Sequence, residues 1–440
     1  MNSLFLQYQF GNIHDGALQR LARKSEFERL LESATPNCYK YARGKKDVSG
    51  ISCLEMDDTT GQFLLSCGTD GSVSVWSLDE KLDTVNNELY SKRINYNAKS
   101  IGTEELSPSK KRAKTSSPAP RMVHSFETRQ SKFRMYRQSS DLNKLAEQET
   151  EDNSISEGHR FRIASAKWYS IDNGMFFTGS NDCRVKIWDT NSFEPVQEVN
   201  LDYRINQIDT DNEGTYIVAA TEDYFPRIID LKNIVSSGIT NLSSQDMNHE
   251  ILCCKFNPVK THIVSTGDSQ GNIKLWDLRM RNRLLLELRQ RDSRRAHLKS
   301  CNDLCWNAGG TELASTGNDG KCYIWSPFTT PISSRQIGPM DLMRNNSKKR
   351  TSQRLLRFED YLLCNTDYGE IQVFETAEGK LCNKIDYPVS QLPSKSDAAR
   401  FSGMAMQSSL ANSRGIRLYL GTTAANSNGM ENSACLCEYM

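Results

Sequence analysis

The stretch MFFTGSNDCRVKIWDT, residues 175–190, contains two apolar runs separated by a short polar turn. The turn is rich in Gly, Ser, Asn and Asp, and the second run alternates between apolar and polar residues until it ends in Trp188. Alternation with a period of two is typical of a half-buried β-strand, and a turn of this composition between two such runs is typical of a hairpin. The stretch therefore predicts two antiparallel strands around a tight turn.

The same pattern recurs along the chain. Clear copies occupy residues 63–78, 262–278 and 312–327, and weaker copies occupy residues 216–231, 361–376 and 418–439. The residues that end the second run in each copy recur mostly at about 40 to 50 residues, the interval of four-stranded propeller blades. These anchors are Trp76, Trp188, Ile229, Trp276, Trp325, Phe374 and Cys437. The repeats predict an all-β, seven-bladed propeller over residues 36–440.

Two segments are expected to complete this ring. The last copy lacks its outer strand, and we expect residues 37–44 to supply it, because pairing of the two chain ends would remove an exposed sheet edge. Residues 121–126 have a strand-like pattern and are expected to form the outer strand of the first blade. They follow a long interruption of the repeat, so this outer strand would be displaced in sequence from the rest of its blade.

Residues 1–35 lie outside the repeats and predict a short helical segment. The apolar residues of 17–33 fall at helical spacing among Arg, Lys and Glu, which is typical of an amphipathic helix. These residues are Leu18, Leu21, Phe27, Leu30 and Leu31. Such a helix either folds back on the ring or docks in a groove of a partner. We expect residues 1–35 to be a partner-docking segment, with these five side chains in the contact.

Residues 81–157 interrupt the repeat with a polar, charged and Ser-rich insertion that cannot bury much apolar surface. The insertion is therefore expected to be mostly disordered. Within it, four cations lie between prolines and suit either a solvated loop, a nuclear import receptor or a phosphate backbone. These cations are Lys110, Lys111, Arg112 and Lys114.

Composition excludes several classes of protein. The formal net charge of +1 provides no overall field toward nucleic acid or an anionic membrane. The thirteen cysteines are scattered without paired CxxC halves, which favours reduced intracellular thiols over a zinc site. No cleavable leader and no apolar window of about 18 residues is present, so we expect a soluble protein of the cytosol or nucleus with no membrane segment.

Catalytic motifs are absent from the sequence. It contains no GxSxG, HExxH, phosphate-binding or dinucleotide glycine pattern. The histidines His14, His124 and His262 have no cysteine or acidic neighbour at a ligand-like spacing. We therefore expect no enzyme activity, no cofactor and no metal, and a rigid disc that offers two faces and a rim for binding.

The repeated units resemble WD repeats. In that family a His before the blade, a Ser or Thr, an Asp and the Trp form a hydrogen-bonded tetrad, because a buried indole and imidazole need polar partners. The resemblance implies two complete structural tetrads in this chain. They are His159, Thr178, Asp182 and Trp188 in one unit, and His297, Ser315, Asp319 and Trp325 in another.

Arg279 follows Trp276 and Asp277 and is not needed by a core strand. The strand runs about 20 Å from the turn on one face, at about 3.3 Å per residue, so the residues after its Trp emerge on the opposite face. Lys232 stands at the corresponding position of the preceding unit, where it places a second cation at the same level. Arg279 is either a solvated turn residue that pairs with Asp277 or part of a partner contact.

A subset of WD-repeat proteins carries WDxR as a docking signature for the adaptor of cullin-RING ubiquitin ligases, usually with a helical amino-terminal segment. The run at 159–193, the successive endings WDTN, DLK and WDLR, and the helix resemble the Cockayne syndrome A family, which acts in transcription-coupled nucleotide-excision repair. This resemblance covers most of residues 1–330. It implies that the helix, Arg279, Asp277 and Lys232 bind the ligase adaptor.

The resemblance implies a nuclear, non-enzymatic substrate-recognition subunit that is a monomer within a larger complex. Its second face would bind repair proteins or proteins associated with RNA polymerase II. The competing hypothesis is a WD-repeat scaffold or a histone- or chromatin-binding subunit without a ligase. Direct binding to nucleic acid would need a basic central face, and a net charge of +1 gives that hypothesis little support.

Overall fold

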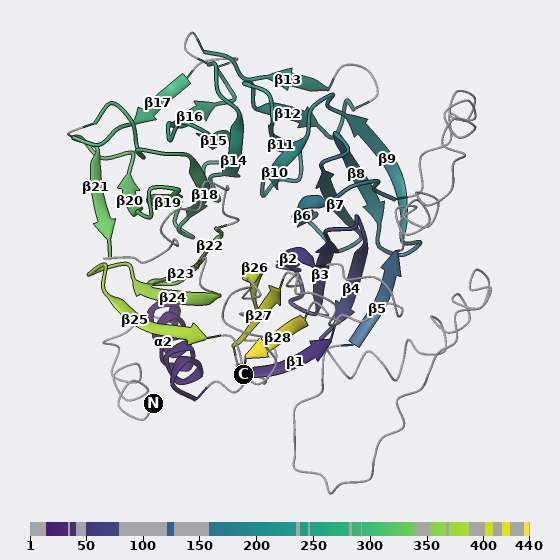
Figure 1. Ribbon diagram of the computed structural model, residues 1–440, viewed down its shortest axis with the longest axis horizontal. Coiled ribbons are helices and arrows are strands. Elements are labelled where there is room, and N and C mark those ends of the chain that lie inside the picture. The colour runs from purple at the N-terminus through teal and green to yellow at the C-terminus, as the bar shows by residue number, and fades with distance from the viewer. Residues whose placement is uncertain are drawn as a thin grey trace, which may run out of the picture.

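The structure is a computed structural model in which the described residues form a ring of seven four-stranded antiparallel sheets (Figure 1). This confirms the predicted all-β, seven-bladed propeller. The described residues are 15–33, 36–40, 50–78, 121–126, 158–234, 238–244, 247–280, 284–291, 293–338, 353–366, 369–386, 401–407, 416–422 and 435–439. Most of the predicted insertion at 81–157, including its four-cation run, lies outside them.

Each blade has its first strand nearest the axis and its fourth at the rim (Figure 1). Blade one consists of β2 (Ile51–Met56), β3 (Phe63–Gly68), β4 (Val73–Ser77) and β5 (Arg121–Phe126), and blade two of β6 (Ile163–Trp168), β7 (Met175–Ser180), β8 (Arg184–Asp189) and β9 (Glu194–Asn200). Blade three consists of β10 (Ile205–Thr210), β11 (Tyr216–Thr221), β12 (Arg227–Asp230) and β13 (Ile239–Asn241), and blade four of β14 (Ile251–Phe256), β15 (Ile263–Asp268), β16 (Ile273–Asp277) and β17 (Leu284–Leu288).

The remaining blades follow the same plan. Their strands are β18 (Cys301–Trp306), β19 (Leu313–Gly317), β20 (Cys322–Ser326) and β21 (Ser333–Ile337); β22 (Leu355–Phe358), β23 (Tyr361–Asn365), β24 (Glu370–Glu375) and β25 (Leu381–Asp386); and β26 (Phe401–Gln407), β27 (Arg417–Thr422), β28 (Cys435–Tyr439) and β1 (Pro36–Lys40). The helix α2 (Asp15–Ser33) precedes the ring and agrees with the helix predicted over 17–33. No helix in the described ranges has the length and apolar character needed to cross a bilayer.

The ring closes by pairing the two ends of the chain. The strand β1 lies antiparallel to β28, with Cys38 opposite Cys437, so the seventh blade takes its outer strand from the start of the chain. This confirms the predicted closure, and the described part of the predicted strand is residues 36–40. The first blade likewise takes β5 as its outer strand, with Val73 opposite Phe126, as predicted for residues 121–126.

The apolar core lies between neighbouring blades. For example, Leu65 and Val75 of blade one pack in one cluster with Ile163 and Trp168 of blade two. Each such cluster joins two sheets face to face, so no blade can bury its apolar surface alone. The ring is therefore a single packed unit.

Two blades contain a tetrad with complete hydrogen bonding. In blade two the His159 ring contacts Asp182 at 2.8 Å and Thr178 at 2.6 Å, and the Trp188 indole donates to the Thr178 hydroxyl at 2.8 Å. Burial lowers the pKa of His159 despite the nearby Asp182 carboxylate, which favours a neutral imidazole. In blade five the corresponding contacts of His297 with Asp319 and Ser315 are 3.2 and 2.8 Å, and Trp325 donates to Ser315 at 2.9 Å.

Blades one and four retain only the indole half of this arrangement. Trp76 donates to Ser66 at 2.8 Å, and Trp276 donates to Thr266 at 2.9 Å. Within the described part of blade four, the His249 ring makes no hydrogen bond. The indole and its hydroxyl partner therefore form the minimum that these blades share.

Blades three and seven have no tryptophan in their strands, and each contains a buried ion pair. In blade three the Arg227 guanidinium contacts Asp223 at 2.8 Å and lies over the Tyr203 ring. In blade seven Arg417 contacts Glu438 at 2.9 Å, and both side chains are almost fully buried. The register position that Trp188 fills in blade two is filled by Ile229 in blade three and by Tyr439 in blade seven, and this lack of a tryptophan explains why the two copies look weak in the sequence.

Candidate partner-binding face

The turns that follow the third strands of blades two, three and four share one geometry. The carboxylates of Asp189, Asp230 and Asp277 each accept a hydrogen bond from the backbone N–H two residues later, at 3.2, 2.9 and 3.0 Å. Because the three turns are closed in the same way, each presents the side chain of the residue two positions after its Asp at a corresponding place. The exposed side chains presented in this way are Asn191, Lys232 and Arg279.

Arg279 is held by the aspartate of its own turn. Its Nε donates to Oδ1 of Asp277 at 3.0 Å and its Nη2 donates to Oδ2 at 2.7 Å. The hydrogen bond from Arg279 is the main reason that the pKa of Asp277 is lowered. The Arg279 side chain is nevertheless 65% exposed. Asp277 thus orients the guanidinium through one edge, and neither bond uses Nη1.

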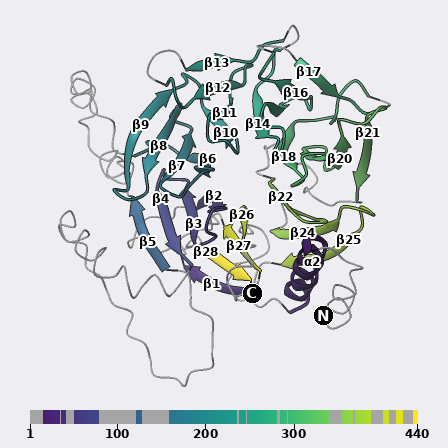
Figure 2. The same ribbon diagram turned by 180° about the vertical axis from the view of Figure 1, so that it is seen from behind.

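The helix lies on the same face of the ring as Arg279. Since consecutive strands of a blade are antiparallel, the turns after the first and third strands lie on one face and the remaining turns lie on the other. The helix contacts Glu359 and Asp360 after the first strand of blade six, and Glu375 at the end of its third strand. Figure 2 shows α2 in front of β24 and β25 on this face. We call it the helix face.

Distance around the ring separates the predicted contacts. Arg279 and Lys232 lie on adjacent blades, four and three, whereas α2 lies on blade six (Figure 2). Blade five stands between the two groups. A single partner that touches both must therefore extend across blade five.

Apolar packing fixes the helix to blade six. Phe27 is fully buried, with its ring centroid 5.2 Å from that of Phe358 and 5.1 Å from that of Tyr361. Leu30 is also buried in this cluster, and Leu31 packs against it in part. The cluster includes residues of blade seven as well, so the helix covers the junction between the sixth and seventh blades.

Ion pairs surround this apolar contact. Arg20 and Arg23 contact Glu359 at 3.4 and 3.3 Å, and Lys24 contacts Glu375 at 3.3 Å. These pairs are partly exposed, so each contributes little alone, but together they fix the orientation of the helix. The acidic residues lie more than three hundred positions further along the chain, in a turn and at a strand end of blade six, which is why the sequence did not predict these ion pairs.

The packing divides the five apolar residues proposed for a partner. Phe27, Leu30 and Leu31 contact the propeller, which is the folded-back alternative for this helix. Leu18 is half-buried and Leu21 is 37% exposed, so these two lie outside the main contact. Docking of the helix on a partner through Leu18 and Leu21 remains a prediction.

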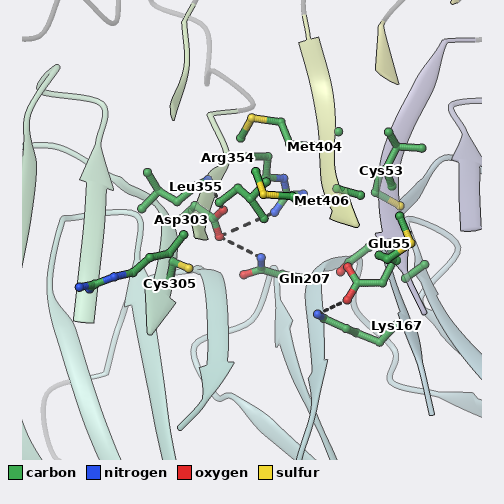
Figure 3. Close-up of a pocket in the computed structure, with 18 of the residues that line it drawn as sticks. Cys53, Glu55, Lys167, Gln207, Asp303, Cys305, Arg354, Leu355, Met404 and Met406 are labelled. Atoms are coloured by element: carbon green, nitrogen blue, oxygen red, sulfur yellow. Dashed lines mark hydrogen bonds and ion pairs between the residues drawn. The ribbon is translucent and has the colours of Figure 1, made fainter. Parts of the chain in front are cut away.

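The first strands of the blades line a central cavity of about 350 Å³ (Figure 3). At the same position of four consecutive first strands the charges alternate in sign, in the order Glu55, Lys167, Asp209 and Lys255. Lys167 contacts Glu55 and lies 3.5 Å from Asp209, which in turn lies 3.3 Å from Lys255. Aligning the fifth residue of each first strand would have revealed this alternation of charge in the sequence.

A further carboxylate of the cavity, that of Asp303, is also paired. Asp303 accepts a hydrogen bond from Gln207 at 3.0 Å and lies 4.0 Å from the Arg354 guanidinium (Figure 3). It accepts another hydrogen bond from the backbone N–H of Leu355 at 2.9 Å. The four alternating charges and Asp303 therefore pair with one another or with polar groups of the cavity. Among the described residues, no group of His, Cys, Asp and Glu side chains is placed to hold a metal ion.

Residues 40–77, 152–189, 240–277 and 289–326 match the family described as WD domain, G-beta repeat. Radiation-sensitive protein 28 of Saccharomyces cerevisiae is 40% identical to this chain over an alignment of 506 residues, which covers 99% of each protein. The chain belongs to this WD-repeat family. Each of the four matched stretches ends one residue after a Trp anchor, in blades one, two, four and five, and no match ends in the other three blades.

Two further comparisons place this WD-repeat protein. The WD repeat-containing protein ATCSA-1 of Arabidopsis thaliana is 32% identical over 133 residues, or 30% of this chain and 29% of that protein. This similarity bears out the predicted likeness to the Cockayne syndrome A group. The β-propeller domain of Cps50 (Swd1) from Myceliophteria thermophila superposes with a TM-score of 0.57 at 14% identity, and covers 92% of this chain and 99% of that one. This second likeness is one of fold.

Proposed function

We propose that this WD-repeat protein is a substrate-recognition subunit of a cullin-RING ubiquitin ligase and acts in transcription-coupled nucleotide-excision repair. Similarity over the full length to a protein named for radiation sensitivity is the main support for a role in repair. The local similarity to ATCSA-1 and the WDLR turn of blade four support the ligase role. The protein would act in the nucleus, as one copy within a larger assembly.

In this proposal the two faces have different partners. Arg279, Asp277, Lys232 and the outward side of α2 bind the ligase adaptor on the helix face. The opposite face binds a repair protein or a protein associated with RNA polymerase II. The propeller itself catalyses nothing, and transfer of ubiquitin belongs to other subunits.

Arg279 suits an adaptor contact for a physical reason. A guanidinium presents several N–H donors in a fixed plane, and its contact with Asp277 holds that plane in one orientation before the partner arrives. Pre-ordering the side chain reduces the entropy that binding would otherwise cost. A lysine at the same position would supply the charge without the directed fork.

Replacing Arg279 by Glu is expected to reduce recovery of the adaptor with the tagged full-length protein by at least about tenfold. The substitution removes the directed hydrogen bonds and places a second acid beside Asp277, and loss of a paired interface charge typically costs about 2–5 kcal/mol. The adaptor and the protein would be quantified together after affinity purification.

Arg204→Glu is the matched control. Arg204 is 66% exposed, almost the same as Arg279, but it lies on the opposite face, where it contacts Glu222 at 3.7 Å. This control should recover the adaptor as the native protein does. Recovery of equal amounts of adaptor by Arg279→Glu and native protein would refute the contact, whereas absence of the adaptor from both would favour the scaffold or chromatin-binding alternative.

A further inference from the structure

A strongly basic loop joins blades four and five on the face opposite α2. This loop, residues 289–300, connects β17 to β18, and five of its residues are Arg or Lys while one is Asp. The structure describes all of it except residue 292, and all five cationic side chains are exposed. They are Arg289, Arg291, Arg294, Arg295 and Lys299. We call residues 289–300 the basic loop.

The basic loop is held in place by the tetrad of blade five. His297 belongs to that tetrad, and its backbone N–H donates to the carbonyl of Gly271 at 2.9 Å. The next N–H, of Leu298, donates to the Asp319 carboxylate at 3.0 Å, and the Arg295 side chain donates to the Gln270 side chain at 2.8 Å. These bonds attach the loop to blades four and five, so its cations project from a fixed backbone.

Most of the positive charge in the loop is not neutralised by the protein. Arg289 contacts Glu287 at 2.5 Å, whereas Arg295 contacts a neutral amide. Within the described part of the chain, Arg291, Arg294 and Lys299 form no ion pair. The Asp268 residue is buried and the Asp319 side chain is 5% exposed, and both carboxylates accept hydrogen bonds from backbone N–H groups.

An exposed apolar residue lies among these cations. The Leu298 side chain is 64% exposed, although its own backbone N–H is held by the hydrogen bond to Asp319. An apolar side chain in this position costs free energy in water, and a partner that covers it recovers part of that cost. The loop therefore combines a rigid backbone, unneutralised cations and an apolar contact point.

We infer that the basic loop binds an acidic segment of a partner protein, rich in Asp and Glu and carrying an apolar side chain for Leu298. Opposite charges attract within a Debye length of about 8–10 Å, and a fixed loop loses little entropy when it binds. The inference rests on the proposed function only for the assignment of this face to substrate or repair partners.

Charge distribution favours an acidic protein segment over nucleic acid. Binding to a duplex usually draws on an extended basic footprint, whereas these five cations belong to one loop, and Arg162 and Arg204 on the same face lie beside Glu222 and Glu250 in a protein whose net charge is +1. The loop also contains no Phe, Tyr or Trp on which a base would stack. Leu298 instead suits an aliphatic or aromatic side chain of a peptide.

The test measures binding of three fluorescent probes to the purified full-length protein by anisotropy. The probes are a short peptide of Asp, Glu and Leu, the same peptide with Asn and Gln in place of the acids, and a DNA duplex of mixed sequence. The native protein should bind the acidic peptide, bind the neutral one at least about tenfold more weakly, and lose affinity as salt rises.

Two variants locate the site. Arg294→Glu with Lys299→Glu should weaken binding of the acidic peptide by about tenfold, because two attractions become repulsions. Arg294→Gln with Lys299→Gln should weaken it by about threefold and keeps the test usable if the reversed variant folds poorly. The control, Lys380→Glu with Lys384→Glu, changes the net charge equally at two exposed residues of blade six and should bind as the native protein does.

Several results would overturn the inference. They are native affinity in both loop variants, an equal loss in the blade-six control, tighter binding of the duplex than of the acidic peptide, or no binding of the acidic peptide by the native protein. The assay contains no ligase adaptor, so its outcome is independent of the Arg279 experiment. Failure of one proposal is therefore distinguishable from failure of the other.

Discussion

Removing residues 435–440 is expected to prevent the protein from accumulating as a soluble, folded ring. This deletion takes away β28, which lies between β1 and β27 and joins the two ends of the chain. It also removes the buried side chains of Leu436, Cys437 and Tyr439 from the core. Loss of a large buried side chain costs about 2–5 kcal/mol, so the summed loss approaches the whole stability of a typical domain, about 5–15 kcal/mol.

A single substitution tests the same closure more gently. Glu438 is fully buried and contacts Arg417 at 2.9 Å and the Tyr419 hydroxyl at 3.1 Å. Glu438→Gln keeps the shape but leaves the Arg417 charge without its counterion, and breaking a buried pair in this way typically costs about 3–5 kcal/mol. The free energy of unfolding would be measured by denaturant titration.

An exposed glutamate provides the matched control for this substitution. Glu194 lies on the outer strand of blade two, and Glu194→Gln should change the free energy of unfolding by less than about 0.5 kcal/mol. If Glu438→Gln unfolds at the same denaturant concentration as the native protein, the buried pair does not stabilise the closure. The seventh blade would then depend on its strand pairing and its apolar contacts.

Replacing Phe27 by Asp is expected to release α2 from the ring without unfolding the blades. Phe27 is the fully buried centre of the helix contact, and truncation of a buried Phe typically costs about 3–5 kcal/mol. A carboxylate at this position adds the cost of burying a charge, which the helix avoids by detaching. The remaining ion pairs are partly exposed and too weak to hold the helix alone.

Hydrogen exchange followed by mass spectrometry measures this release. The amides of residues 15–33 should exchange much faster in Phe27→Asp, while the strands of blades one to five keep their protection. Gln19→Ala, an exposed position on the same helix, is the control and should exchange as the native protein does. Retained protection of residues 15–33 in Phe27→Asp would show that the helix is held by contacts other than the Phe27 cluster.

The regular blades were accessible from the sequence because their anchors are chemically distinctive. A buried Trp with a hydroxyl partner ten residues earlier, as in Thr178 and Trp188, leaves a pattern that recurs at a fixed period. The closing strand was also predictable, because an unpaired last strand requires a partner. These features depend on local spacing, which a sequence displays directly.

Other features depend on contacts between residues far apart in the chain. The buried ion pair of Arg417 with Glu438 joins the second and third strands of blade seven, and nothing in the spacing of the two residues indicates it. The apolar stripe of α2 predicted a buried face but not which surface covers it. The contact of Phe27 with Phe358 and Tyr361 shows that the propeller covers this face. The sequence did not indicate this contact, because the two residues lie more than three hundred positions from Phe27.

The proposed adaptor site lies between these two cases. The sequence placed Arg279 beyond the strand and Lys232 at the matching position, and the structure adds that Asp277 orients the Arg279 guanidinium. It also separates these residues from α2 by one blade, which the sequence alone did not indicate. An adaptor that uses both contacts must therefore be broad.

The central claim is that this ring is a substrate receptor attached to a cullin-RING ligase, and one measurement tests it most directly. The tagged full-length protein would be purified from its own host, and the proteins that accompany it would be identified and quantified by mass spectrometry. The account predicts the ligase adaptor and a cullin in amounts comparable to the protein, together with proteins associated with RNA polymerase II. Recovery of histone-binding or other assembly subunits, with neither adaptor nor cullin, would contradict it.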